Sequence, residues 1–161
     1  MATELKNLSQ FDFEIPSAKG MKIAIVVAQW NSGITSKLKD GAEKLCKEHG
    51  AEVFTYVVPG AYELTMGSKF AASQSDIDAV IAIGCVIKGD TPHFEYICSG
   101  VTHGLNSVAI EANKPIIFGV LTVNTQLQAE ERAGGRLGNK GEEAGATAIQ
   151  MVALKNAIVN D

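Results

Sequence analysis

The chain has 161 residues, 46% of them hydrophobic and 20% charged, which fits one globular domain with an ordinary core and excludes a second domain of similar size. Its formal net charge is -4 and its pI is near 5.4, so nucleic acid and anionic membrane surfaces are not expected partners. Any anion that it binds must be held by a few local donors, which favours a small phosphorylated or carboxylated ligand.

The N-terminal residues 1–20 are expected to form an arm on a single domain that spans residues 1–161. The first six residues lack the basic stretch and apolar run of a secretory signal, so we expect a cytoplasmic protein. Residues 11–15 alternate between apolar and acidic side chains before Pro16, a pattern typical of a strand. Because this strand lies outside the repeating scheme described next, we expect it to pair with a neighbouring subunit.

Segments rich in Val and Ile alternate with helical patterns along the rest of the chain. Buried, parallel strands are predicted at 22–28, 52–58, 79–87 and 115–121. Helices are predicted at 34–46, 64–71, 92–111, 125–133 and 142–158. This alternation predicts a three-layer α/β/α sandwich around a mainly parallel, four-stranded sheet, similar to flavodoxins. The longest apolar run, 79–87, is far below the roughly 20 residues that span a bilayer.

A glycine-rich stretch at 134–141 interrupts the last two helical patterns and is predicted as a kink or loop. Ligands of open parallel sheets usually bind at the carboxyl ends of the strands. That rule predicts candidate sites at Trp30 and Asn31, at 60–63, at 86–93 and at Phe118.

The segment 88–94, KGDTPHF, turns from the third strand into a helix. Pro92 suits the first helical position, which makes Thr91 the predicted cap. The unpaired N–H groups of the first helical turn favour a bound phosphate, and His93 beside it is suited to proton transfer near neutral pH. The same pattern is also typical of an ordinary capped helix with a surface histidine.

Other candidates carry similar alternatives. Arg132 and Lys140 are placed to reach an anion, although cations also stabilise helix C-termini. Trp30 is suited to stacking on a flat heterocycle or to anchoring its turn. Glu63 fits the start of a helix equally well without a ligand, and Phe118 fits the core.

The three cysteines are widely spaced and contain no Cys-x-x-Cys pair, so neither a disulfide framework nor a zinc site is predicted. Cys85 has no adjacent base and is interpreted as a buried thiol rather than a nucleophile.

Two motifs resemble those of the lumazine synthase family. They are GCVIKGDTPHF at residues 84–94, and QAEERAG at 128–134 followed by GNKG at 138–141. The resemblance covers the chain from Met21 to its end in the family's order and spacing. Departures occur at Gln29, Trp30 and Thr65, where many relatives have arginine, phenylalanine and proline.

The resemblance implies a transferase of riboflavin biosynthesis that needs no metal and no other cofactor. Its substrates would be 5-amino-6-(D-ribitylamino)uracil and 3,4-dihydroxy-2-butanone 4-phosphate. His93 matches the family's proton-transfer histidine, and Asp90, Thr91 and Arg132 match its phosphate-binding residues, the arginine coming from a neighbouring subunit. The other residues that match its substrate-binding positions are Trp30, Asn31, Ala61, Tyr62, Glu63, Cys85, Val86, Ile87, Phe118, Lys140 and Glu143.

The family also implies an assembly. Its members form pentamers with active sites between subunits, and the short loop between the last helices resembles relatives that form an icosahedral shell, for which riboflavin synthase is a candidate partner. Two alternatives remain at this stage. One is a flavodoxin-like module that binds a flavin or nucleotide without catalysis, which the lack of Gly-x-Gly-x-x-Gly and Walker motifs disfavours. The other is a related pentameric riboflavin-forming enzyme, against which His93 and the Arg132 region argue.

Overall fold

Four parallel strands form the sheet in the order β2-β1-β3-β4. They are β1 (Lys22–Ala28), β2 (Glu52–Val58), β3 (Ala79–Ile87) and β4 (Ile116–Val123) in a computed structural model that describes residues 7–160. The predicted bounds of the first three strands are confirmed. The fourth begins one residue later and ends two residues later than expected, because its pairing with β3 continues to Val123 opposite Ile87.

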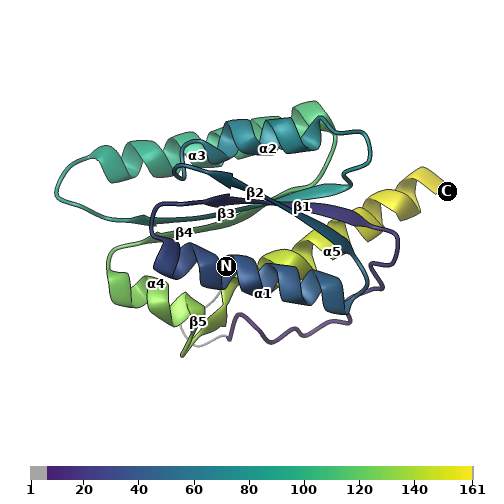
Figure 1. Cartoon of the computed structure of the whole chain (residues 1–161), viewed down its shortest axis with the longest axis horizontal. Coiled ribbons are helices and arrows are strands. Elements are labelled where there is room, and N and C mark those ends of the chain that lie inside the picture. The colour runs from purple at the N-terminus through teal and green to yellow at the C-terminus, as the bar shows by residue number, and fades with distance from the viewer. Residues whose placement is uncertain (1–6, 161) are drawn as a thin grey trace.

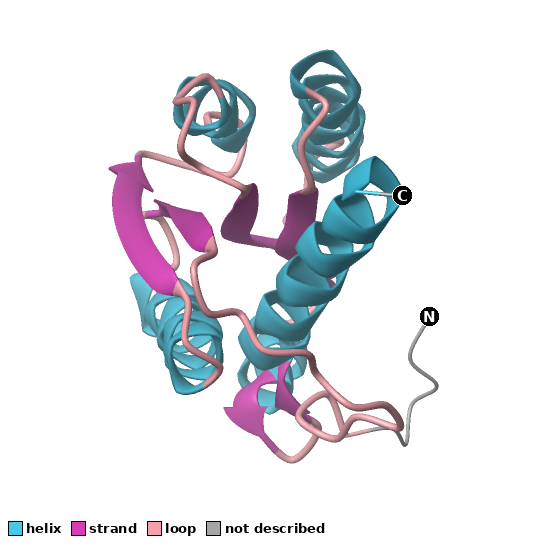
Figure 2. Ribbon diagram, turned by 90° about the vertical axis from the view of Figure 1, so that its right-hand side faces the viewer, coloured by secondary structure: helices cyan, strands magenta, loops and turns pink. Residues whose placement is uncertain are grey.

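Five helices cover the two faces of this sheet (Figures 1 and 2). Helices α1 (Ser32–Glu48), α4 (Gln126–Arg132) and α5 (Lys140–Asn160) lie on one face, and α2 (Leu64–Ala72) and α3 (His93–Ala112) lie on the other. Successive residues of β1 point to opposite faces of the sheet. Ile23 and Ile25 therefore pack in the core shared with α1 and α5, and Ala24 and Val26 pack in the core shared with α2 and α3. The predicted three-layer sandwich is therefore confirmed.

The two outer strands of the sheet differ from the prediction. All four strands were expected to be buried, but Thr55, Tyr56 and Val57 of β2 and Phe118 and Thr122 of β4 are exposed. An edge strand has a neighbour on one side only, and apolar content in the sequence does not distinguish it from a central strand.

The glycine-rich stretch forms a small antiparallel hairpin, which corrects the prediction of a kink or loop. Strand β5 (Ala133–Gly135) pairs with β6 (Gly138–Asn139), and the pair contains an irregularity in register. Gly134 and Gly138 have φ angles of 93° and 84°, in the left-handed region that favours glycine.

The N-terminal arm is described only in part, because residues 1–6 lie outside the described chain. No strand is assigned at 11–15 within the chain, where Phe11 packs against the core. Pairing of this segment with another subunit stays a prediction. No helix within residues 7–160 is long and apolar enough to cross a membrane.

The backbones of helices α1 and α5 approach each other closely at Gly141. A Cβ atom added to Gly141 would overlap the carbonyl oxygen of Leu38, which is main chain and has little freedom to move. Glycine at this position is therefore required by packing rather than by its φ angle.

Replacing Gly141 with Ala should lower the free energy of unfolding by about 1–3 kcal/mol or more, because α5 must shift away from α1. Chemical denaturation at matched protein concentration measures this change. Gly33→Ala is the control, since a Cβ there meets nothing within 4 Å, and it should be neutral or slightly stabilising in the first turn of α1. Equal stability of the two variants would contradict the packing argument.

Candidate functional site

The carboxyl end of β1 leads into a turn that is tied to both neighbouring strands. The Trp30 N–H donates to the Pro59 oxygen at 3.0 Å, which joins the turn to the segment after β2. Asn31 has a left-handed backbone with φ of 59°, and its Nδ2 donates to the Cys85 oxygen of β3 at 2.9 Å. The loops that follow three strands are thus held at one edge.

Trp30 presents its indole ring at this edge. The ring lies against Gly60, where a Cβ atom would collide with it, and the residue is 66% exposed. Most of its surface is available for contact with another group, which favours stacking over the alternative of a partly buried anchor.

The segment after β2 is fixed by a local hydrogen bond between residues three positions apart. Glu63 Oε2 accepts from the Gly60 N–H at 3.1 Å, so the carboxylate closes the turn before α2. Tyr62 lies beside Gly100 of α3 and is 59% exposed, and Ala61, which precedes it in the chain, is buried. The turn at Gly60 adjoins Trp30, and an exposed aromatic ring follows it two residues later.

The segment after β3 brings His93 to the same edge. Helix α3 begins at His93, so Pro92 rather than Thr91 occupies the cap position, and the prediction was wrong by one residue. The Thr91 hydroxyl accepts from the His93 N–H only at 3.4 Å, while the Pro92 oxygen accepts from Glu95 at 3.1 Å. His93 lies in the first turn as expected.

The polar groups of this loop are exposed. Asp90, Thr91 and His93 all face solvent, and the Lys88 ammonium lies 6.0 Å from the centre of the Phe94 ring and 3.6 Å from Glu95. N–H groups of the first turn of α3 and the positive end of its dipole suit an anion at this place.

Cys85 is buried at the end of β3, next to the half-buried Val86 and Ile87. Burial raises the pKa of its thiol to about 11, so the group stays protonated near neutral pH. This supports its interpretation as an unreactive thiol whose backbone oxygen orients Asn31.

A second group of predicted residues lies elsewhere. Phe118, Lys140 and Glu143 line a cavity of about 290 Å³ between β4 and α5, with the Lys140 ammonium 2.8 Å from the Glu143 carboxylate. Phe118 pairs with Ala82, well before the carboxyl end of β3. Its predicted position at the carboxyl edge of the sheet was therefore wrong.

Arg132 ends α4 and is held by its own helix. Its Nη1 donates to the Gln128 oxygen at 3.0 Å and lies 3.9 Å from Glu131. The placement of a cation at a helix C-terminus is as expected from the dipole. In this conformation the guanidinium hydrogen-bonds to α4 rather than to the loop that carries His93.

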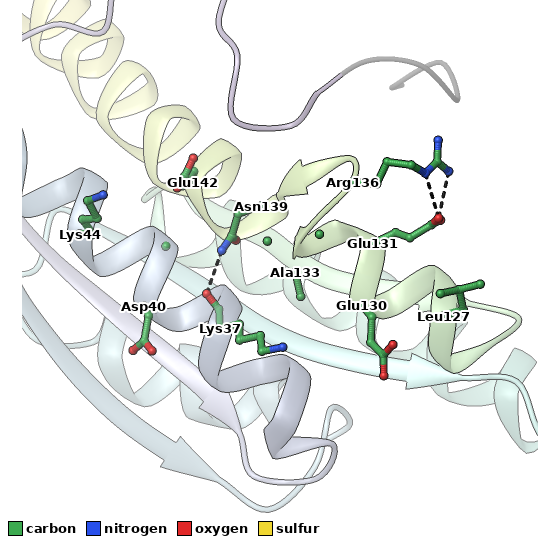
Figure 3. A pocket seen from close by; sticks show the side chains of 13 residues that line it. Lys37, Asp40, Lys44, Leu127, Glu130, Glu131, Ala133, Arg136, Asn139 and Glu142 are labelled. Atoms are coloured by element: carbon green, nitrogen blue, oxygen red, sulfur yellow. Dashed lines mark hydrogen bonds and ion pairs between the residues drawn. The ribbon is translucent and has the colours of Figure 1, made fainter.

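Sequence reasoning missed a larger cavity of about 660 Å³ between α1 and the β5–β6 hairpin (Figure 3). Its walls include Lys37 and Asp40 from α1 and Asn139 from the hairpin. Asn139 is about a hundred positions from Lys37 and Asp40 in the chain, and no local motif marks them as neighbours. Within residues 7–160 no group of three or more His, Cys, Asp or Glu side chains is arranged to hold a metal ion.

Comparison with known proteins identifies the family. Residues 20–156 match the family described as 6,7-dimethyl-8-ribityllumazine synthase. Proteins of that name from Porphyromonas gingivalis and Phocaeicola vulgatus are 52% and 49% identical to this chain, covering 96% and 98% of it and 99% and 96% of their own length. The protein of that name from Thermus thermophilus is 48% identical over 89% of this chain and 94% of its own. The chain belongs to the 6,7-dimethyl-8-ribityllumazine synthase family.

Proposed function

We propose that the protein condenses 5-amino-6-(D-ribitylamino)uracil with 3,4-dihydroxy-2-butanone 4-phosphate to give 6,7-dimethyl-8-ribityllumazine and phosphate, the penultimate step of riboflavin biosynthesis. One observation carries the proposal within the structure: an exposed indole ring after β1 and an exposed histidine at the start of α3 both lie at the carboxyl edge of the sheet. Near 50% identity to relatives of that name over almost the whole chain supports the same reaction.

The uracil substrate would occupy the edge formed by the first three strands. Trp30 would stack on the pyrimidine ring, and the ends of β3 at Cys85, Val86 and Ile87 would lie beneath it. The ribityl chain would extend along Asn31 and the segment of Ala61, Tyr62 and Glu63. Backbone N–H groups and one carboxylate there can hydrogen-bond hydroxyls.

The ketone phosphate would bind at the start of α3. Asp90 and Thr91 would place the backbone around the phosphate, whose charge is favoured by the helix dipole. The amine at position 5 of the uracil would attack the ketone, and imine formation with loss of one water, loss of phosphate, and closure by the ribityl-bearing nitrogen with loss of a second water would follow. These steps depend on holding two substrates face to face and on proton transfer, for which His93 is the candidate group.

The remaining predicted site residues can complete the site only if a neighbouring copy of the chain supplies them. Phe118, Lys140 and Glu143 line a separate cavity, and Arg132 hydrogen-bonds within α4. We therefore propose that each active site lies between two subunits of a pentamer, with Arg132 reaching the phosphate and Phe118 forming a wall from the adjacent copy. We expect this assembly to work in the cytoplasm.

His93→Ala should lower kcat by about 10²–10⁴-fold with little change in substrate binding, because it removes proton transfer and leaves the binding groups in place. The measurement is product formation, followed by absorbance and fluorescence against a protein-free control. His103→Ala is a matched control on the same helix, since His103 is also exposed and its Nδ1 faces Ser99 of its own helix. Loss of binding with normal kcat would contradict the role of His93.

Two impaired variants should recover activity when they share an assembly. In mixed oligomers of His93→Ala and Arg132→Ala, random arrangement gives roughly a quarter of the interfaces one intact His93 and one intact Arg132. Co-expression followed by the lumazine assay measures this recovery. Activity no higher than that of the separate variants, from oligomers shown to be mixed, would place the whole site within one subunit.

We also propose that the pentamers assemble into an icosahedral shell, for which a riboflavin synthase is a candidate partner. The hairpin between α4 and α5 is short, with only Arg136 and Leu137 between its strands, and offers no bulky insertion to separate pentamers. Sedimentation velocity should show a species far heavier than a pentamer. A single species of pentamer mass would refute the shell.

A further inference from the structure

Asn139 makes hydrogen bonds to three separate parts of the chain. Its Nδ2 donates to the Lys37 oxygen of α1 at 2.9 Å (Figure 3), and its Oδ1 accepts from the Gly141 N–H of α5 at 2.8 Å. Its own N–H donates to the Ser9 hydroxyl of the N-terminal arm at 2.9 Å. Side chain and backbone together therefore fix the residue against α1, α5 and the arm.

The packing around Asn139 leaves its carboxamide little room to move. A Cβ atom on Gly41 of α1 would lie 2.7 Å from the carboxamide, so only glycine there admits it. Gly138, which precedes Asn139, lies against the backbone of Leu8 and Ser9 in the same way, and the Leu8 N–H donates to the Leu137 oxygen at 2.7 Å. The position of β6 is thus set by contacts with the backbone on both sides.

Asn139 is linked through the hairpin to two cations, Arg132 and Lys140. It pairs with Ala133 across the hairpin, so Arg132 precedes one member of this pair and Lys140 follows the other. The two residues leave the hairpin at the same end although eight positions separate them. A shift of Asn139 relative to α1 would move both cations together.

We propose that Asn139 is a positioning residue that sets where Arg132 and Lys140 stand toward the phosphate of the ketone substrate. The inference rests on the proposed function, in which Arg132 binds that phosphate. The side chain of Asn139 is engaged with Lys37 and Gly141, so the role inferred for it is to hold the hairpin and not to bind substrate. It holds the base of the hairpin against α1 through the hydrogen bond that its Nδ2 donates to the Lys37 oxygen.

Asn139→Ser tests this role because serine keeps a neutral oxygen that caps α5 but cannot reach the Lys37 oxygen. We expect KM for the ketone phosphate, and the inhibition constant of inorganic phosphate, to rise about tenfold, as for a weakened hydrogen bond to a charged group. The kcat and the KM for the uracil substrate should stay close to those of the unchanged protein.

Asn113→Ala is the matched control for lost stability. Asn113 has a left-handed backbone with φ of 50° at the C-terminal end of α3, remote in the fold from the hairpin, so alanine should lower the melting temperature without raising either constant. The inference is overturned if Asn139→Ser changes both KM values and kcat in proportion to its loss of melting temperature, because that is the result of a general structural defect. It is also overturned, with the proposed function intact, if Arg132→Ala raises the KM for the ketone phosphate and Asn139→Ser does not. An unchanged KM in Arg132→Ala would instead refute the phosphate assignment itself.

Discussion

The parallel pairing of β1 with β3 at the centre of the sheet is the constraint on which the site depends. Parallel neighbours need a crossover between them, so every connecting loop that follows a strand begins at the same edge. The hydrogen bond from Asn31 to the Cys85 oxygen fixes the loop after β1 against β3. Because buried strands hold the backbone, an exposed indole and an exposed histidine are both presented at that edge.

A second constraint is the close approach of α1 and α5. Glycines at 41 and 141 let backbone and carboxamide groups touch directly, and hydrogen bonds through Asn139 replace the side-chain packing that would otherwise fill the space. This contact locates the hairpin, and the hairpin in turn locates Arg132 and Lys140. Arg132 and Lys140 are thereby held in place by the α1–α5 contact and not by the loops at the carboxyl edge of the sheet.

The charge of the protein and the chemistry of its site are consistent with each other. A chain of formal charge -4 has no general attraction for a phosphorylated substrate. Local donors must supply the attraction, and the N-terminal turn of α3 offers N–H groups and a dipole while Arg132 and Lys140 offer full charges. Within one chain Arg132 hydrogen-bonds to its own helix and Lys140 pairs with Glu143, which is why we propose a site shared between copies.

The sequence by itself determined the strands, the helices and the segments at the strand ends, because hydrophobic period and turn residues act locally. It therefore located Trp30, Tyr62 and His93 correctly at one edge. Only the tertiary structure decided that β2 is an exposed edge strand, that Phe118 lies away from the carboxyl end, and that residues 133–139 form a hairpin. The first two depend on which distant segments pair, because strand order and register are not encoded in any local window of residues. The hairpin is local, but it is held in place by contacts with α1 and the N-terminal arm, which lie about a hundred positions or more away.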